Sequence, residues 1–392
     1  MSLYESLQER FLQLRREAMW RSRFPADIPR DTGSGKDDGH PINFSSNDYL
    51  GLATHPEMKK AMQAGIEKFG VGSTASQLVC GYTSAHQALE TSLCEITGRD
   101  RAILFSSGYM ANLAMVTALC SRGDIVLGDR LNHASLNDAA RLSAARFLRY
   151  PHVDVTALKK RLLDGAGYFR HAMVITESVF SMDGDIAPLH EIASCCIEQN
   201  ALLAVDDAHG FGVLGEHGQG VLEARSLNQE QAPLLMITFG KALGSSGAAI
   251  IGKDVLLEQI LQSARTLIYT TAPPPALAVA TRRALSLLQE EAWRRERLGS
   301  NIKRFVRGAQ ERNLPLLDSV TPIQPLILGT ADRAVQCSRQ LLQRGFLITA
   351  IRPPTVPANT SRLRIVLSST HTDEQIERLL DASHSVLSKL PQ

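Results

Sequence analysis

Glycines and polar residues follow five short apolar runs of this 392-residue chain, at points where strands are expected to end. In chain order, the residues that could carry chemistry are Ser107, Gly108 and Tyr109, then His133, Glu177, Ser178 and Ser181, then Asp206 and His209, and finally Thr238 and Lys241. Ligands of open α/β sheets bind outside the carboxyl ends of the strands. We therefore expect these side chains to gather at one sheet edge.

Three of these signals suggest chemistry but also have ordinary structural explanations. Gly108 and its neighbours would open a helix whose free N–H groups favour a phosphate, although for this tripeptide alone a simple N-cap is the more common explanation. Asp206 would end a buried strand, where a protonated heterocyclic nitrogen, a salt bridge or a turn cap could satisfy its carboxylate. Lys241 lies in a glycine-containing turn and could form a Schiff base or be a surface lysine.

Two histidines complete the set. His209 could hydrogen-bond a phenolic oxygen, and His133 could lie flat on a cofactor ring, although histidines in turns are often structural. N-capping by Asn132 is the competing explanation of the turn that carries His133, and both interpretations can hold together.

The combination is more specific than its members. Pyridoxal phosphate (PLP) requires a phosphate cradle, a carboxylate at its pyridine nitrogen, a lysine at its aldehyde and a flat neighbour for its ring. The sequence therefore predicts a PLP site. No metal site is predicted, because the six cysteines form no CxxC pair and have no histidine at ligand spacing.

The apolar pattern predicts an α/β fold. Short continuous apolar runs alternate with helical patterns between residues 100 and 252, which indicates a buried, mainly parallel sheet. We predict helices at Val155–Leu163, with Asp154 as cap, and at Leu189–Gln199, with Pro188 at its start. The predicted division is an N-terminal helical arm and loop over residues 1–41, a large domain over 42–285 and a small α+β domain over 286–392.

Composition excludes several classes of partner. The chain has 42 Lys and Arg against 40 Asp and Glu, without a basic cluster typical of nucleic-acid binding. It has no apolar run long enough to span a membrane, and its start, Met1–Arg23, is charged throughout. We expect an unexported protein in a reducing cytoplasm with its cysteines unpaired.

Several motifs in the same order resemble those of the α-oxoamine synthases, a family of PLP-dependent enzymes. They are Asn43–Leu52, Val179–Asp185, Asp206–Gly210 and Thr238–Lys241, and the resemblance extends from about Arg21 to the last helix. It implies an aspartate aminotransferase-like fold, and a homodimer in which the Ile268–Thr271 segment reaches the neighbouring cofactor. It also implies a decarboxylative condensation of an amino acid with an acyl thioester.

The run Ala350–Pro357 is similar to the branch of this family that serves biotin biosynthesis, for which the substrates would be L-alanine and a pimeloyl thioester. The carrier, coenzyme A or acyl-carrier protein, stays open. By this resemblance Lys241, Asp206, His209 and His133 are catalytic, and the cofactor is also held by Gly108, Tyr109, Ser181 and Thr238. The implied substrate-binding residues are Arg21, Asn47, His133, Arg352 and Thr355.

The chain departs from the family pattern at two places. Thr74 and Ala75 occupy a run that is richer in glycine in relatives, and Phe211 stands where smaller residues are frequent. Both could alter the space for the acyl chain or cofactor. Alternatives are a synthase that uses glycine with acetyl-CoA or succinyl-CoA, and a non-catalytic homologue. An NAD-binding module is excluded because no GxGxxG follows an early strand.

Overall fold

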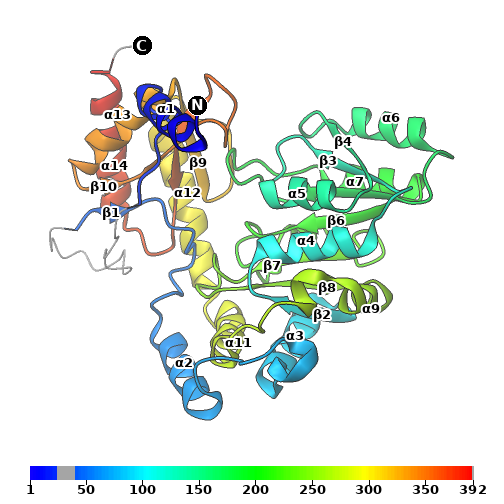
Figure 1. The fold of residues 1–392 in the computed structure, drawn as a ribbon. Coiled ribbons are helices and arrows are strands. Elements are labelled where there is room, and N and C mark those ends of the chain that lie inside the picture. The colour runs from blue at the N-terminus through cyan, green and yellow to red at the C-terminus, as the bar shows by residue number, and fades with distance from the viewer. Residues whose placement is uncertain (24–39, 391–392) are drawn as a thin grey trace. The chain divides into compact units, whose positions relative to one another are not determined.

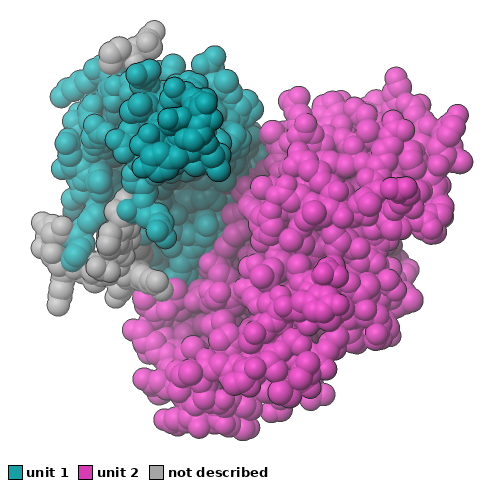
Figure 2. All heavy atoms as spheres, viewed as in Figure 1, with its two compact units in different colours: residues 1–51, 182–185, 296–392 teal, residues 52–181, 186–295 magenta. Residues whose placement is uncertain are grey.

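The computed structural model describes residues 1–23 and 40–390, which form two compact units (Figure 2). Unit 1 comprises Met1–Gly51, Met182–Asp185 and Glu296–Gln392, and unit 2 comprises Leu52–Ser181 and Ile186–Arg295. Most of the predicted loop between Pro25 and Pro41 lies outside the described residues. The three-part division after residues 41 and 285 stays a prediction.

A seven-stranded sheet forms the centre of unit 2, in the order β2-β8-β7-β6-β5-β3-β4 (Figure 1). The strands are β2 Arg101–Phe105, β3 Ile125–Asp129, β4 Arg146–Tyr150, β5 Ala172–Glu177, β6 Leu202–Asp206, β7 Leu234–Thr238 and β8 Ala248–Gly252. In this sheet β8 runs antiparallel to its neighbours β2 and β7, while β3 to β7 pair in parallel. The predicted α/β fold with a mainly parallel sheet is confirmed.

Several helices of unit 2 bury one side against the sheet, while others pack on neighbouring helices. The helices are α2 Pro56–Phe69, α3 Ser84–Thr97, α4 Gly108–Leu119, α5 Ala134–Leu142, α6 Val155–Gly165, α7 Leu189–Glu198, α8 Val221–Ala224, α9 Asp254–Ser263, α10 Arg265–Ile268 and α11 Pro275–Glu290. Met115 of α4, Leu136 of α5 and Ile260 of α9 share one core cluster with strand residues such as Ile175. Burying each such side chain contributes about 1.5–3 kcal/mol. This packing holds these helices against the sheet, and it therefore also fixes the positions of their first residues.

Local signals set several helix ends as expected. Asp154 caps α6 by accepting the Ala157 N–H at 2.8 Å, and Pro188 stands directly before α7. Strand β4 was not predicted, because it is an edge strand on which Arg146 and Arg149 are exposed, and it therefore has no continuous apolar run.

Unit 1 is built from both ends of the chain. Its elements are α1 Leu3–Arg16, β1 Ile42–Asn43, α12 Trp293–Glu311, β9 Ile323–Gly329, α13 Ala331–Leu342, β10 Phe346–Leu347, β11 Thr349–Ile351, β12 Ser361–Val366 and α14 Asp373–Leu387. Strands β11, β12 and β9 form an antiparallel sheet, and β1 pairs with β10 in parallel. The mostly apolar residues 346–351 are divided between β10 and β11, and the helical residues from Pro275 to Glu311 form two helices, α11 and α12.

No helix in the described part of the chain is long and apolar enough to cross a membrane. All six cysteines are free.

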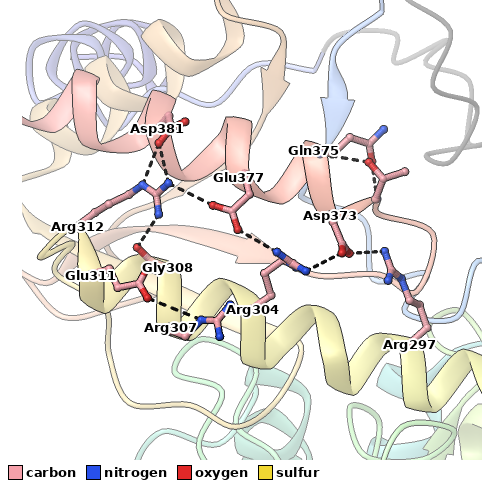
Figure 3. Close-up of polar contacts among 11 residues, drawn as sticks. Arg297, Arg304, Arg307, Gly308, Glu311, Arg312, Asp373, Gln375, Glu377 and Asp381 are labelled. Carbon is pink, nitrogen blue, oxygen red and sulfur yellow. Dashed lines mark hydrogen bonds and ion pairs between the residues drawn. The ribbon is translucent and has the colours of Figure 1, made fainter.

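A ladder of ion pairs joins α12 to α14 (Figure 3). Asp373, Glu377 and Asp381 recur every four residues and therefore line one face of α14. Arg304 pairs with both Asp373, at 2.6 Å, and Glu377, at 3.3 Å. Arg297 and Arg312 extend the ladder at its two ends. Because each arginine is already fixed by a neighbour, the network costs less side-chain entropy than isolated pairs.

We predict that Arg304→Met lowers the free energy of unfolding by about 1 kcal/mol, because it removes the link between two carboxylates of a network. The loss should shrink at roughly 1 M salt, where surface charges are screened. Urea denaturation at matched protein concentration measures both effects. Arg307→Met is the control, since Arg307 makes one exposed pair with Glu311 at 3.8 Å. An equal loss in both variants would contradict the network.

Candidate active site

The predicted lysine and one predicted histidine are in contact at the carboxyl ends of β6 and β7. Lys241 Nζ lies 2.9 Å from His209 Nε2. Lys241 stands in the tight turn after β7, which is closed by the Gly244 N–H donating to the Lys241 carbonyl at 2.9 Å. Gly244 has φ +59°, and a β carbon there would collide with the backbone of Ala53. The glycine therefore allows the turn that presents the lysine.

Asp206, the last residue of β6, is buried but well supplied with donors. Its Oδ2 accepts from Asn112 Nδ2 at 2.8 Å, and its Oδ1 accepts from the Ala208 N–H at 3.0 Å. A buried carboxylate is costly unless donors or a cation satisfy it. The turn cap that was one alternative for Asp206 therefore exists, together with a side-chain donor from α4. An acceptor held in this way fits a protonated ring nitrogen.

Asp207, the next residue, shapes the turn that carries His209. Its carboxyl is fully buried and accepts from the Ser178 hydroxyl and, at 3.0 Å, from the Val221 N–H. Burial raises the pKa of Asp207 to about 7. A β carbon at Gly210 would collide with this carboxyl group. The Asp-Asp-Ala-His-Gly motif thus contains two acids with different roles. Asp206 belongs to the site, and Asp207 is packed into the protein and holds the turn.

His133 is the N-cap of α5, and its ring Nδ1 accepts the Ser135 N–H at 3.3 Å. The prediction that Asn132 caps this helix is wrong. The Asn132 side chain instead donates to the Ile175 carbonyl at 2.8 Å and accepts from the Glu177 N–H at 3.2 Å. Asn132 therefore ties the turn to β5, and His133 both caps the helix and belongs to the site.

Glu177, the last residue of β5, is a buried acid beside Asp206 of β6. Our sequence analysis lists it among the residues that could carry chemistry but gives it no role. Its two carboxyl oxygens accept the backbone N–H groups of His133, at 2.5 Å, and of Ser181, at 3.2 Å. Burial, followed by the charge of Asp206, raises its pKa to about 8. Glu177 thus holds two predicted site residues in place, and its position at a strand end was the signal that could have identified it.

The predicted phosphate cradle is the N-terminus of α4. Ser107 is its N-cap and accepts the Met110 N–H at 3.2 Å. A β carbon at Gly108 would lie 2.6 Å from Thr238 Cγ2, so the helix start packs directly on the end of β7. Tyr109 is partly exposed, and its hydroxyl donates to Asp138. A helix N-terminus without a side chain at its first residue suits a phosphate.

Together these groups fit PLP. All eight predicted cofactor residues belong to unit 2, where Lys241, His209 and Asp206 lie at neighbouring strand ends and Gly108 packs against Thr238. Asp206 would hold the ring nitrogen, Lys241 the aldehyde carbon, and the start of α4 the phosphate.

The predicted substrate residues, apart from His133, lie in unit 1. Arg352 donates to the Ala18 carbonyl and, at 3.3 Å, to the Trp20 carbonyl. Arg21 Nη2 lies 3.5 Å from Thr355 Oγ1. Arg21, Arg352 and Thr355 therefore lie together where the N-terminal arm contacts residues 352–355.

Asn47, the fourth of these residues, lies beside Arg364. Its Oδ1 accepts from Arg364 Nη1 at 3.0 Å and from the Tyr49 hydroxyl at 3.3 Å. These two donors fix the orientation of the amide, because the oxygen must face them. The Asn47 Nδ2 group is thereby presented on the other side as a donor, which is what a carboxylate requires.

The two departures from the family pattern have visible structural settings. Thr74 adopts φ +60°, a left-handed conformation that glycine reaches more easily, which agrees with the glycine-rich run of relatives. Phe211 is buried in unit 2, directly after the turn that carries His209. Their effect on substrate or cofactor stays a prediction.

We predict that Gly108→Ala weakens PLP binding about tenfold or more, because the added methyl pushes the start of α4 away from β7. Fluorescence titration of the apoprotein with PLP measures the affinity. The double variant Gly108→Ala with Thr238→Ser is the control, since it removes the colliding methyl and keeps the hydroxyl. It should recover most of the affinity, and a double variant as weak as the single one would refute the packing argument.

Comparisons with known proteins agree with this geometry. The family model described as aminotransferase class I and II matches residues 39–382. An 8-amino-7-oxononanoate synthase from Methylococcus capsulatus is 52% identical over 93% of both chains, and one from Pseudomonas savastanoi is 53% identical over 88% of this chain and 87% of its own.

Two solved structures are similar over most of the chain. A serine palmitoyltransferase from S. paucimobilis, solved with bound PLP and myriocin, has a TM-score of 0.92 at 28% identity and covers 98% of both chains. An 8-amino-7-oxononanoate synthase from Francisella tularensis has a TM-score of 0.78 at 31% identity and covers 90% of this chain and 99% of its own. The chain therefore belongs to the aminotransferase class I and II family and, within it, to the 8-amino-7-oxononanoate synthases.

Proposed function

We propose that this protein catalyses the decarboxylative condensation of L-alanine with a pimeloyl thioester in biotin biosynthesis. The products are 8-amino-7-oxononanoate, carbon dioxide and the free thiol of coenzyme A or acyl-carrier protein. The observation that carries the proposal is the contact between Lys241 and His209, next to the donor-supplied Asp206, in a chain about half identical to named synthases.

The described residues supply the acid, the base and the cofactor supports. When bound, PLP supplies a pyridine ring that accepts the electron pair left at the reacting carbon. Asp206 would hold the proton of the ring nitrogen, and its own donors, Asn112 and Ala208, fix the position of its carboxylate. Lys241 would hold the cofactor, and its free Nζ would act as the base that removes the Cα proton of alanine. His209, beside Lys241, supports the phenolic oxygen of the ring.

The bond changes follow from the substrates. Cα of alanine forms a bond to the thioester carbonyl carbon, the carbon–sulfur bond breaks, and the sulfur leaves as a thiol after gaining a proton. The carboxylate of alanine then leaves as carbon dioxide, and the same carbon gains a proton. Arg352 and Asn47 suit the carboxylate, because a guanidinium and an amide N–H group both donate to it. Arg21 and Thr355 lie beside Arg352 and extend this polar region.

We further propose that the protein acts as a homodimer that buries an apolar surface of unit 2. In the described chain, Val71, Leu78, Val79 and Tyr269 are strongly exposed. The segments that carry them are joined, because Ser76 bridges to Thr271 and the Ala272 N–H donates to the Ala75 carbonyl at 2.9 Å. A contiguous apolar surface of this kind favours a second copy as its partner.

The activity is tested by mixing purified protein with PLP, L-alanine and pimeloyl-CoA, and identifying the product by mass spectrometry. We predict that Lys241→Ala lowers condensation at least a hundredfold, as expected for loss of a general base. Borohydride should attach the cofactor to Lys241 in the parent protein. Lys253→Ala is the matched control, because Lys253 pairs with Glu230 on the surface.

Glycine with acetyl-CoA or succinyl-CoA is the competing pair of substrates in the same assay. Faster turnover with glycine would reassign the substrates within the family. A protein that stays colourless with PLP and forms no product from either amino acid would refute the proposed function and favour a non-catalytic role.

We predict that Val71→Asp combined with Val79→Asp shifts the protein toward a monomer, because two charges then have to be buried at the proposed interface. Light scattering after size-exclusion chromatography measures the mass in solution. Tyr168→Asp is the control, since Tyr168 is similarly exposed in another part of unit 2. A dimer that survives the double substitution would place the interface elsewhere.

A further inference from the structure

A chain of hydrogen bonds runs through unit 2 from Asp206 to His133. Asp206 Oδ2 accepts from Asn112 Nδ2 at 2.8 Å, and the same Nδ2 donates to Ser135 Oγ at 2.9 Å. Ser135 Oγ in turn lies 2.7 Å from His133 Nδ1. Asn112 and Ser135 are each 1% exposed, so water does not compete for these bonds. The proposed pyridine partner and the proposed stacking histidine are therefore linked through two side chains from α4 and α5.

The direction of each bond follows from the donors available. An ionised carboxylate can only accept, so the amide nitrogen of Asn112 must face Asp206. Both N–H groups of that nitrogen are then used, one on Asp206 and one on Ser135. Among the described residues Asn112 Oδ1 is buried without a hydrogen-bond partner. Leaving an acceptor unsatisfied costs about 1–3 kcal/mol, and the two donor bonds of Nδ2 act against this cost.

The same directions fix the proton of His133. Because Ser135 Oγ accepts from Asn112, its own proton is available for His133 Nδ1. The Ser135 backbone N–H also donates to Nδ1, at 3.3 Å. A ring nitrogen that accepts two hydrogen bonds cannot carry a proton, so the proton of the neutral ring lies on Nε2.

We propose that Asn112 and Ser135 are positioning residues for the proposed reaction, which hold His133 as the neutral tautomer with its proton on Nε2 and link that tautomer to Asp206. This inference rests on the proposed function only for its consequence in catalysis. An Nε2–H group is a donor for a carbonyl oxygen that gains negative charge as the new carbon–carbon bond forms. With the proton on Nδ1, the ring would present an acceptor to that oxygen and repel it.

The charged groups around His133 act in opposite directions. Partial withdrawal of the ring from water lowers the pKa of His133, Asp206 on β6 raises it, Lys241 after β7 lowers it, and Asp138 on α5 raises it. Glu177 on β5 accepts the backbone N–H of His133 and not the ring. The two hydrogen bonds to Nδ1 therefore decide which nitrogen carries the proton, whatever the balance of these charges.

The test is nitrogen NMR of the full-length protein labelled with ¹⁵N-histidine, with and without PLP, since the two ring nitrogens have distinct shifts in each tautomer. The His133→Gln variant identifies the signals. In the parent protein we expect a protonated Nε2 and an unprotonated Nδ1. A proton on Nδ1 in the parent protein would overturn the proposal without any further variant.

Ser135→Ala removes one of the two donors to Nδ1. We expect a measurable population with the proton on Nδ1, a higher pKa of His133, and a kcat about tenfold lower with little change in KM for alanine. Asn112→Ala breaks the chain one bond earlier and should shift the tautomer in the same direction to a smaller extent. An unchanged His133 spectrum and kcat in both folded variants would refute the positioning role.

Ser143→Ala is the matched control. Ser143 is also a buried serine, the C-cap that follows α5, and its hydroxyl donates to the Ala140 carbonyl at 2.7 Å, away from His133. It should lower stability without altering the His133 signals. If the parent protein shows the expected tautomer but no condensation with any tested substrate, the proposed function fails and the tautomer assignment stands.

Discussion

The site depends on the cost of placing a charged carboxylate at the end of a buried strand. Asp206 ends the middle strand of the central sheet and is buried, where a carboxylate that lacks hydrogen-bond donors is costly. The Asn112 amide of α4 and the Ala208 backbone N–H of the next turn donate hydrogen bonds to the carboxylate and offset this cost. Much of the surrounding arrangement follows from the need to bring those donors to it.

Three acids lie together at this sheet edge and have different environments. Glu177 accepts two backbone N–H groups, Asp207 is surrounded by a hydroxyl, a backbone N–H and glycines, and Asp206 has the Asn112 amide. Burial raises the pKa of Glu177 and of Asp207 toward neutrality. The proximity of three acids means that charge on one discourages charge on the others. Giving one of them a side-chain amide donor from a neighbouring helix selects it as the acceptor for the ring.

The sequence was sufficient for the parts of this arrangement that have local signals. Apolar runs indicated six of the seven central strands, and the residues that follow them indicated Lys241, His209, Asp206 and Gly108 as neighbours. Strand β4 has no such run, because as an edge strand it exposes two arginines. Contacts between segments that are distant in the sequence could not be predicted in this way. In the sequence Asn112 is an ordinary polar residue within a helical pattern, and its contact with Asp206 exists only because α4 packs beside β6. Similarly, the local sequence favours Asn132 as a helix cap. It does not cap α5, because its side chain forms hydrogen bonds with the backbone of β5.

The construction of unit 1 from both ends of the chain has a consequence for the order of folding during synthesis. Residues 42–43 pair with residues 346–347, and the Phe44 carbonyl accepts from the Val366 N–H. Strand β1 can therefore pair only after β10 and β12 have been synthesised. The central sheet of unit 2, by contrast, is complete once residue 252 has left the ribosome. Domains generally fold as units as they emerge. The cofactor side of the enzyme can therefore form while the arginine and asparagine proposed for the substrate carboxylate are still apart, and the last segment to be made brings them into one unit.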